Sequence, residues 1–380
     1  MSDSAIYWIW LSTAVPYGSA VGKHLYRVWG SARGVFEADA DKIRADRYVT
    51  PRIADAIVKK DLSRAAEILT LCGRYGVSVF TPDMPEYPAD LLKIANYPLV
   101  LYSIGTVKDF NSRPAFASVG TREASQKGLK NAYEFGKECA GMGVTVVSGL
   151  ALGIDTQSAL GALDAGGVTV AVLGCGCDKV YPPQNKELYD RIIGNGAVVS
   201  EYPPMTLPYR THFPERNRII SGMSLCTVVV ESGEQSGSLI TARYAVSHER
   251  PLFAYGGSAG TEALIAERAT RIECAADVAA HLDAPRHTTV KQPDRPQVAV
   301  ASQTRQTPAE QAPNPFVSSL DSEKQSVYRA IRDEMTVDEI IIALSDAGST
   351  MSPQQIMAAL TYLEAFGLII RSAGAAYKRK

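Results

Sequence analysis

Apolar runs suited to buried strands alternate with amphipathic segments through the middle of this chain, from about residue 77 to residue 283. The runs that predict strands span residues 115–119, 144–149, 168–174, 197–201, 226–231 and 251–256. The segments between them have helical spacing, at residues 126–143, 154–167, 185–196, 215–223 and 238–249. This alternation predicts an α/β domain with a doubly wound parallel sheet. Ligands of such sheets bind in the crevice at the carboxyl ends of the strands.

The same patterns predict three further regions around this domain, which we place at residues 81–285. Residues 1–80 have helical spacing and predict an all-helical domain of the sterile-alpha-motif or helix-hairpin-helix type, which binds either DNA or other proteins. Residues 286–319 are rich in Pro, Gln, Thr, Ser and Ala, which is typical of a disordered linker. Residues 320–380 predict three helices followed by a β-hairpin, which is the element order of a winged-helix domain.

Composition and charge exclude few classes of protein. The chain has 380 residues and a formal net charge of −1 at pH 7, so any nucleic acid must bind a local basic groove. No signal peptide is apparent and no apolar run approaches the roughly 20 residues of a membrane span, so we expect a cytoplasmic protein. The six cysteines are scattered, and Cys175 and Cys177 form a lone C-x-C without a second pair. We therefore expect buried thiols and no metal site.

Two short segments carry the strongest chemical signal. The segment 209–222, YRTHFPERNRIISG, places three arginines around one aromatic residue: Arg210, Arg216, Arg218 and Phe213. The segment 231–245, ESGEQSGSLITARYA, puts small hydroxyl residues and glycines ahead of a predicted helix. Guanidinium groups beside small loops at helix N-termini suit phosphate binding, and an aromatic ring between arginines suits base stacking. Together they favour a nucleic-acid binder.

Four loops that follow predicted strands would meet at one crevice of the sheet. They span residues 118–125, 148–155, 173–185 and 232–241. Gly120 permits a tight turn, and Arg122 can point over the crevice. Gly153 allows left-handed backbone geometry, and Asp155 can cap the helix that follows. These loops supply backbone N–H groups and hydroxyls, with added positive charge, and therefore predict an anion cradle.

Each of these residues also has a purely structural interpretation. Arg122 can pair with a glutamate such as Glu201, and Arg216 and Arg218 can pin loops through buried hydrogen bonds. Phe213 can belong to the core. The binding hypothesis depends on the coincidence of the loops at one crevice.

No loop carries a cofactor fingerprint. The dinucleotide pattern G-x-G-x-x-G and the P-loop pattern G-x-x-x-x-G-K-[ST] are both absent, so we expect no cofactor. The five histidines are dispersed, and only His212 lies inside a motif. Glu231 and Glu234 can be interpreted either as catalytic carboxylates or as capping groups.

The motifs taken together resemble the DNA-processing protein family DprA, also called Smf. The resemblance covers roughly residues 85–257, in the order and spacing of SVGTR, SGLALGID, VTVAVLGCGCDKVYPPQN, SEYPP, HFPERNRIISGMS and VVVESGEQSGSLITARYA. It implies an extended Rossmann fold that forms a homodimer. It also implies a non-catalytic protein that binds single-stranded DNA, protects incoming strands and loads the RecA recombinase in natural transformation. The two flanking domains are similar to accessory domains of many members.

The resemblance further implies which residues contact DNA. Arg210 and Phe213 match a basic residue and an aromatic residue that grip the strand and stack a base, and Arg216, Asn217 and Arg218 match the RNR motif. The full expected set for single-stranded DNA and phosphate is Ser118, Gly120, Arg122, Ser148, Gly149, Arg210, Phe213, Arg216, Asn217, Arg218, Gly237 and Ser238.

This sequence departs from the family pattern at two places. Ser158 and Ala159 stand where the family has an Ala-His pair, and AYGGS (254–258) replaces a P-G after the last strand.

The sequence also leaves two questions of function open. The predicted third helix of the winged-helix domain, residues 352–367, contains no Lys or Arg, so this domain contacts either duplex DNA or protein. The alternative function is a nucleotide-binding or phosphoribohydrolase-like Rossmann enzyme. Its catalytic glutamate would fall near residues 241–244, which contain no carboxylate.

Overall fold

The computed structural model describes residues 4–278, 322–331, 335–346, 351, 353–365, 368–371 and 376–379. The chain divides into two compact units, residues 1–290 and 291–380. The predicted linker, residues 286–319, lies outside the described residues. None of the helices described here is long and apolar enough to cross a membrane.

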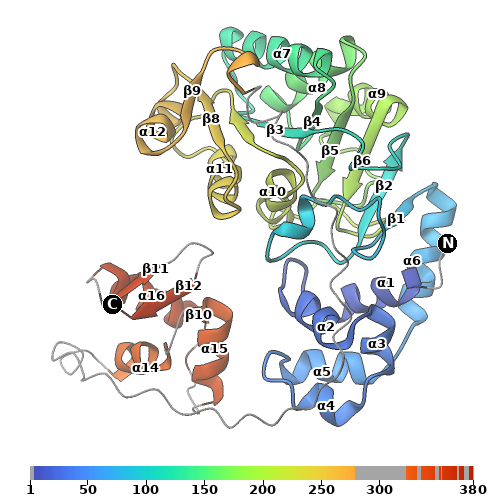
Figure 1. Cartoon of the computed structure of the whole chain (residues 1–380), viewed down its shortest axis with the longest axis vertical. Coiled ribbons are helices and arrows are strands. Elements are labelled where there is room, and N and C mark those ends of the chain that lie inside the picture. Colours follow the sequence, from blue (N-terminus) through green and yellow to red (C-terminus); the bar gives the residue numbers. More distant parts are fainter. Residues whose placement is uncertain are drawn as a thin grey trace. The chain divides into compact units, whose positions relative to one another are not determined.

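A nine-stranded sheet forms the centre of the first unit (Figure 1). Its strands lie in the order β1-β2-β6-β5-β4-β3-β7-β8-β9. The seven strands from β6 to β9 in this order are parallel, whereas β2 is antiparallel to both β1 and β6. The strand bounds are β1 (Ser78–Phe80), β2 (Leu101–Gly105), β3 (Ala115–Val119), β4 (Thr145–Ser148), β5 (Thr169–Leu173), β6 (Gly196–Ser200), β7 (Thr227–Val229), β8 (Leu252–Tyr255) and β9 (Thr270–Ile272).

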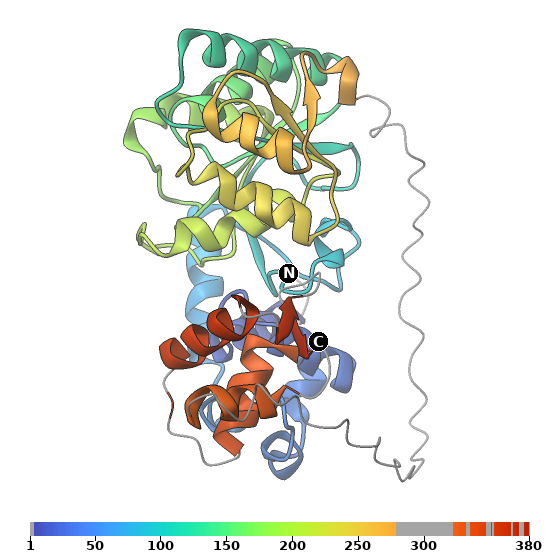
Figure 2. The same ribbon diagram turned by 90° about the vertical axis from the view of Figure 1, so that its left-hand side faces the viewer.

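Helices cover both faces of this sheet. Helices α7 (Gln126–Gly141), α8 (Ile154–Asp164) and α9 (Lys186–Asn195) pack on one face, and α10 (His212–Gly222) and α11 (Ser238–Ser247) pack on the other. Figures 1 and 2 show this separation, with α7 and α8 on the far side of the sheet from α10 and α11. Helix α12 (Ala259–Glu267) connects β8 to β9. Two 3₁₀ turns, η1 (Leu91–Lys93) and η2 (Pro183–Asn185), also lie in this region.

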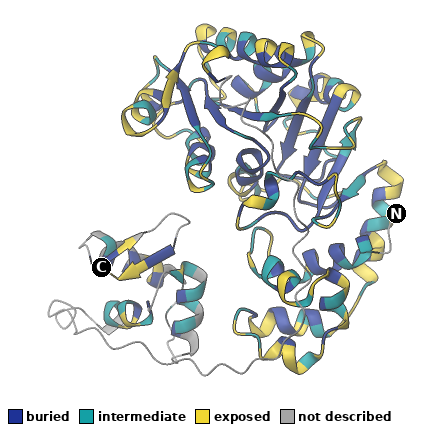
Figure 3. Cartoon of the chain, viewed as in Figure 1, coloured by how far each residue is buried: buried dark blue, intermediate teal, exposed yellow. Residues whose placement is uncertain are grey.

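The predicted doubly wound sheet is confirmed. All six predicted strands are present as β3 to β8, and their side chains are buried on both faces, as Figure 3 shows for the centre of the sheet. The chain winds from β3 through β4 and β5 to β6 in one direction, and through β7 and β8 to β9 in the other. The direction of winding therefore changes between β3 and β7, and the carboxyl ends of these strands are where a crevice is expected.

Six helices precede the sheet and share its core. They are α1 (Ser4–Ala14), α2 (Val21–Trp29), α3 (Ala32–Glu37), α4 (Ala40–Arg44), α5 (Pro51–Val58) and α6 (Ser63–Tyr75). One continuous cluster of buried side chains joins Trp8 and Leu25 of these helices to Phe80 and Tyr102 of the sheet. The helices therefore pack against the sheet within one unit. Their assignment to a sterile-alpha-motif or helix-hairpin-helix class, and a boundary at residue 80, stay predictions.

The second unit is small and mixed. Its helices are α14 (Ser322–Ala330), α15 (Val337–Asp346) and α16 (Pro353–Ala365), and its strands are β10 (Met335–Thr336), β11 (Ile369–Arg371) and β12 (Ala376–Arg379). The strands form an antiparallel sheet in the order β10-β12-β11. Buried apolar residues from all three helices and from the strands, such as Val327, Ile340, Leu360 and Tyr377, form its core. The winged-helix class of this unit and its binding partner stay predictions.

Candidate functional site

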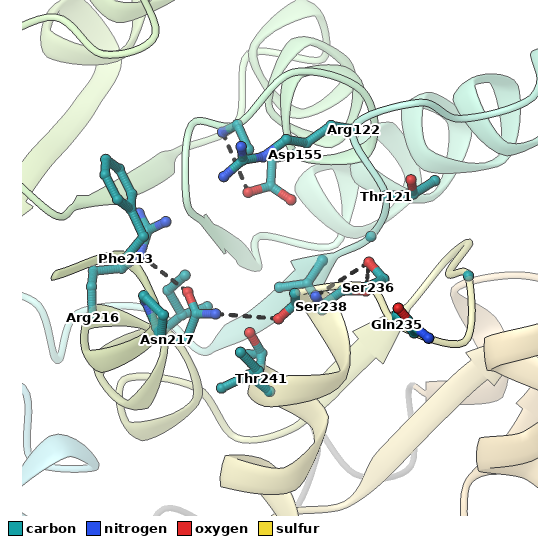
Figure 4. Close-up of a pocket in the computed structure, with 18 of the residues that line it drawn as sticks. Thr121, Arg122, Asp155, Phe213, Arg216, Asn217, Gln235, Ser236, Ser238 and Thr241 are labelled. Carbon is teal, nitrogen blue, oxygen red and sulfur yellow. Dashed lines mark hydrogen bonds between the residues drawn. The ribbon is translucent and has the colours of Figure 1, made fainter. Parts of the chain in front are cut away.

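A cavity of about 780 Å³ lies at the carboxyl ends of β3 and β7. Its lining combines parts of the four loops that follow β3, β4, β5 and β7 with side chains of α10. Figure 4 shows Arg122 and Asp155 on one side of this space and Asn217, Ser238 and Thr241 on the other. The sequence placed these four loops at one crevice, and the structure confirms that they meet.

Two arginines at the edge of the cavity are exposed, and we call them the rim arginines. Arg122 follows β3, and Arg210 precedes α10. Within the described part of the chain, neither guanidinium takes part in a hydrogen bond or an ion pair. Each guanidinium is a cation that offers five N–H donors to a ligand.

The N-terminus of α11 forms one wall of the cavity. Ser236, Gly237 and Ser238 all line it at this point. The Ser238 hydroxyl lies 2.9 Å from the Ser232 hydroxyl and 2.8 Å from the Ser236 hydroxyl, so the three form a chain of hydrogen bonds. The Asn217 amide donates to the Gly237 carbonyl oxygen at 3.5 Å. Backbone N–H groups and the helix dipole at this terminus favour an anion in the cavity.

Arg216 closes the floor of the cavity from α10. Only 5% of its surface is exposed, and its Nη1 donates to the carbonyl oxygens of Gly149, at 3.0 Å, and of Val172. Burial lowers the pKa of the Arg216 guanidinium to about 10, although the nearby Asp155 carboxylate opposes that shift. The group is therefore still charged at neutral pH, but its donors are largely used within the protein.

Asp155 lies beside Arg216 in the same floor. Its Oδ2 accepts hydrogen bonds from the backbone N–H groups of Gly149, at 2.8 Å, and of Ala151, at 3.4 Å. It therefore fixes the loop before α8, where the sequence predicted a cap on the helix itself. Burial raises the pKa of the Asp155 carboxyl to about 6, against the opposing effects of Arg216, the two N–H groups and Arg122. A carboxyl whose pKa is raised toward neutrality thus lies near the arginines of this cavity.

The loop between β4 and α8 is held from several sides. Leu150 is buried with φ at 58°, a left-handed conformation that costs energy for a branched side chain. The buried Asn185 side chain donates to the Leu150 carbonyl oxygen at 2.8 Å and to the Thr156 hydroxyl at 2.9 Å. At Gly149, a Cβ atom would lie 2.6 Å from Nη2 of Arg216, so only glycine leaves room for the guanidinium.

Two aromatic rings meet at the mouth of the cavity. The ring centres of Phe213 and Tyr181 are 5.1 Å apart, and the rings are tilted by 40°. The Arg216 guanidinium lies 6.0 Å from the centre of the Phe213 ring. The site therefore offers flat apolar surface next to its cationic groups, which is the combination that binds nucleobases attached to phosphates.

The predicted site residues are not all at the cavity. Gly120, Arg122, Arg210, Phe213, Arg216, Asn217, Gly237 and Ser238 line it, and Gly149 lines a smaller cavity next to it. The Ser118 hydroxyl lies 2.6 Å from the Ser158 hydroxyl and joins β3 to α8, beneath the site. Ser148 is also buried, and its hydroxyl has no hydrogen-bond partner among the described residues.

Arg218 lies away from both cavities. It is 2% exposed, and its Nη2 donates to Glu201 at 2.5 Å. A Cβ atom at Gly18 would lie 3.2 Å from its Nε, so the side chain packs beneath the segment between α1 and α2. Arg216 and Arg218 are two positions apart on α10 and therefore point about 200° away from each other. Only Arg216 faces the cavity.

Several lining residues were not among the DNA contacts expected from the sequence. Those missing from the expected set of DNA contacts are Thr121, Asp155, Tyr181, Gln235, Ser236 and Thr241, although Asp155 was expected as a helix cap, and all fall within the four loops or at the start of the helices that follow them. Glu231, which the sequence left open as a catalytic or capping group, accepts hydrogen bonds from the Ser125 N–H at 3.0 Å and the Ser125 hydroxyl at 2.6 Å. It therefore holds the start of α7.

Residues 78–283 match the model of the family described as DNA recombination-mediator protein A. The chain belongs to this family. It is 32% identical over 323 residues to Protein Smf of Synechocystis, with 79% of each chain covered.

Solved structures of family members show the same fold. The X-ray structure of DNA processing protein A (DprA) from Streptococcus pneumoniae matches with a TM-score of 0.62 and 30% identity, over 74% of this chain and 99% of that one. A structure of DNA processing protein A from Helicobacter pylori, concerned with its single-stranded DNA binding mode, matches with a TM-score of 0.50 and 26% identity, over 54% and 95% of the two chains. The expected Rossmann-type fold of the DprA family is thus confirmed, and DNA processing in recombination is the general role of the family.

Proposed function

We propose that the cavity at the ends of β3 and β7 binds single-stranded DNA without reading its sequence. The observation that carries the proposal is the position of the two rim arginines, Arg122 and Arg210. They are exposed, have no ionic partner in the described residues, and line the same cavity as the N-terminus of α11. Phosphate groups bind to such guanidinium donors and to helix N-termini. Phe213 and Tyr181 supply the ring surface for bases, at about 1–3 kcal/mol per stacked base.

A single strand fits this arrangement better than a duplex. The bases of a duplex are stacked on each other and do not expose their faces to protein rings, whereas those of a single strand do. The chain carries almost no net charge, so attraction comes from the local cluster of arginines and not from the protein as a whole.

The protein acts as a binding protein, not as an enzyme, and it forms a homodimer that protects incoming strands and hands them to RecA. The family's description as recombination mediators and the single-stranded DNA binding mode of the Helicobacter pylori relative support this role. Glu231, the carboxylate that the sequence left open as a catalytic group, lines neither cavity and holds the start of α7, which supports a binding role. The second unit contacts duplex DNA or a protein partner.

Fluorescence anisotropy tests the binding site. A labelled oligo-dT and a matched duplex are titrated across a salt series with wild type and Arg122→Ala. We expect tight, salt-sensitive binding of the single strand, weaker binding of the duplex, and a slope of log K against log salt that falls by about 0.7 in the variant. Binding that is equal for both DNAs, or unchanged in the variant, would exclude this cavity as the single-strand site. A small nucleotide would then become the better candidate ligand.

A further inference from the structure

We infer that Tyr202 positions the DNA-binding side chains at the start of α10, and that the N-terminal helices support Tyr202 through Tyr17. The inference rests on the proposed binding of single-stranded DNA. It gives the N-terminal helices a part in that binding without any contact between them and the strand. Tyr202 lines neither of the two cavities and is only 1% exposed, so it acts on the site through other residues.

The ring of Tyr202 packs flat against His212, the first residue of α10. The two ring centres are 3.9 Å apart, and the ring planes differ by 9°. The Tyr202 hydroxyl donates to Oε2 of Glu215 at 3.1 Å, about one turn further along the helix. Nδ1 of His212 also lies 3.1 Å from the Gly174 carbonyl oxygen. Tyr202 therefore holds the first turn of α10 at two points.

The start of α10 and the loop before it carry two of the proposed DNA contacts. Phe213 follows His212 directly, and Arg210 lies two residues before it. Both side chains line the main cavity. The His212 N–H donates to the Tyr209 carbonyl oxygen at 3.1 Å, so the backbone next to Arg210 is joined to the start of the helix. A shift of His212 would therefore move Arg210 and Phe213 together.

Tyr202 is itself fixed just after β6. Its N–H donates to the Ser200 hydroxyl at 3.0 Å, and that hydroxyl donates to the Cys175 carbonyl oxygen at 2.7 Å. The residue before it, Glu201, pairs with Arg218 in the second turn of α10. Two consecutive residues thus connect the end of a central strand to two successive turns of α10.

The segment between α1 and α2 contacts both of these connections. The Tyr17 ring meets the Tyr202 ring nearly edge-on, with ring centres 4.9 Å apart and planes at 68°. The next residue, Gly18, packs against Arg218: a Cβ atom at Gly18 would lie 3.2 Å from Nε of Arg218, and its φ of 71° also favours glycine. The N-terminal helices therefore support the helix start that presents the DNA contacts.

The test compares variants of Tyr202 and Tyr17 by fluorescence anisotropy with a labelled oligo-dT. Tyr202→Leu removes the ring and the hydroxyl, whereas Tyr202→Phe keeps the ring. Tyr17→Ala changes a side chain that is 38% exposed, so it keeps the inference testable if Tyr202→Leu fails to fold. Tyr75→Ala is the matched control, because Tyr75 belongs to α6, is also 38% exposed, and is not among the rings that contact Tyr202 in the described residues. Urea unfolding establishes that each variant is folded under the binding conditions.

The inference predicts a graded loss of affinity. Tyr202→Leu should weaken binding of oligo-dT by about 2- to 30-fold, the range for residues that influence a site without touching its ligand. Tyr202→Phe should lose less, because its ring still packs on His212. Tyr17→Ala should weaken binding, and Tyr75→Ala should bind as wild type does. Wild-type affinity of folded Tyr202→Leu or of Tyr17→Ala, or an equal loss in Tyr75→Ala, would overturn the inference while the single-strand site stands.

A double-variant cycle separates positioning from a general loss of structure. In an Arg210→Ala background, the loss caused by Tyr202→Leu or Tyr17→Ala should be smaller, because one of the positioned groups is gone. In an Arg122→Ala background the loss should be undiminished, because Arg122 follows β3 and is not carried by this turn. Equal losses in all three backgrounds would overturn the positioning role. Failure of the wild type to bind oligo-dT would instead overturn the proposed function, and this inference with it.

Discussion

The rim arginines and the two arginines of α10 differ in what they bind inside the protein. Arg122 and Arg210 are exposed and have no ionic partner in the described residues, so their charge is available to a ligand. Arg216 and Arg218 are buried and are engaged with carbonyl oxygens and with a glutamate. The exposed arginines at the edge of the cavity are therefore available to bind a ligand, whereas the buried arginines hold the surrounding backbone in place. The difference implies that stability and DNA affinity can be changed separately.

The largest effect on stability should come from Arg218. Arg218→Ala leaves Glu201 buried without its partner, and we expect the free energy of unfolding to fall by about 3–5 kcal/mol. Urea unfolding followed by circular dichroism measures this loss. The double variant Arg218→Met, Glu201→Leu removes both charges and should recover most of the stability. A double variant as unstable as the single one would mean that the ion pair is not the cause.

Arg216 should affect both properties. Arg216→Ala removes the donor to the carbonyl oxygens of Gly149 and Val172, and each buried acceptor left unpaired costs about 1–3 kcal/mol. The loop before α8 also loses support, so affinity for oligo-dT should fall together with stability. Thermal unfolding and anisotropy on the same preparations test this. If the variant has normal stability but binds oligo-dT weakly, Arg216 contacts DNA directly, as we propose for the rim arginines.

The rim arginines should affect affinity alone. Arg210→Ala should weaken binding of oligo-dT and lower the salt slope by about 0.7. The double variant with Arg122→Ala should lower the slope by about twice as much, because the two arginines lie on different loops and contact different phosphates. The unfolding free energy should stay within about 0.5 kcal/mol of wild type. If the variants of the rim arginines are destabilised, these arginines also contribute to folding, as Arg216 and Arg218 do.

The smallest effect should be a dependence of affinity on pH. The raised pKa of Asp155, about 6, means that lowering the pH from 7.5 to 5 neutralises a carboxylate beside the proposed phosphate site. Affinity for oligo-dT should therefore rise as pH falls, by less than about tenfold, which corresponds to one pKa unit. Asp155→Asn should bind as tightly at pH 7.5 as at pH 5. The same rise in wild type and variant would assign it to other groups.

Asp155 should also change stability with pH in a defined direction. Its pKa is raised by folding, so the folded protein holds a proton that the unfolded chain releases between about pH 4 and pH 6. The contribution of this group to stability is present at pH 4 and is lost as the pH rises through 6. The difference in unfolding free energy between wild type and Asp155→Asn, followed from pH 4 to pH 7, measures it.

The sequence predicted the sheet well because its strands are chemically uniform. Strands such as β5 (Thr169–Leu173) are buried on both faces and consist mainly of Val, Ala and Leu, so they stand out from the helical segments. Strands β1, β2 and β9 were not predicted. The first and last are three residues long and lie at the edges of the sheet, while β2 joins it in the antiparallel direction.

The position of the site was predictable, but the direction of its side chains was not fully so. Parallel topology brings the four loops together, which is why most of the expected residues line one cavity. The expectation that Arg216 and Arg218 act at the same place did not take the helix into account, since two residues this far apart on a helix face opposite ways. Tyr181 and Asn185 lie in the quoted motif at residues 168–185 but received no role, because their roles depend on contacts with Phe213 and Leu150 from other segments.

The close approach of Gly149 to Arg216 couples two positions that are 67 residues apart in the sequence. Any larger residue at position 149 must displace the Arg216 guanidinium. A shorter residue at position 216 would leave space for a side chain at position 149, so glycine would no longer be required there. Neither substitution alone is neutral, so evolutionary drift at one position is blocked until the other changes. Across the family these two positions should therefore vary as a pair, and a chain in which only one of them has changed should carry a compensating substitution nearby.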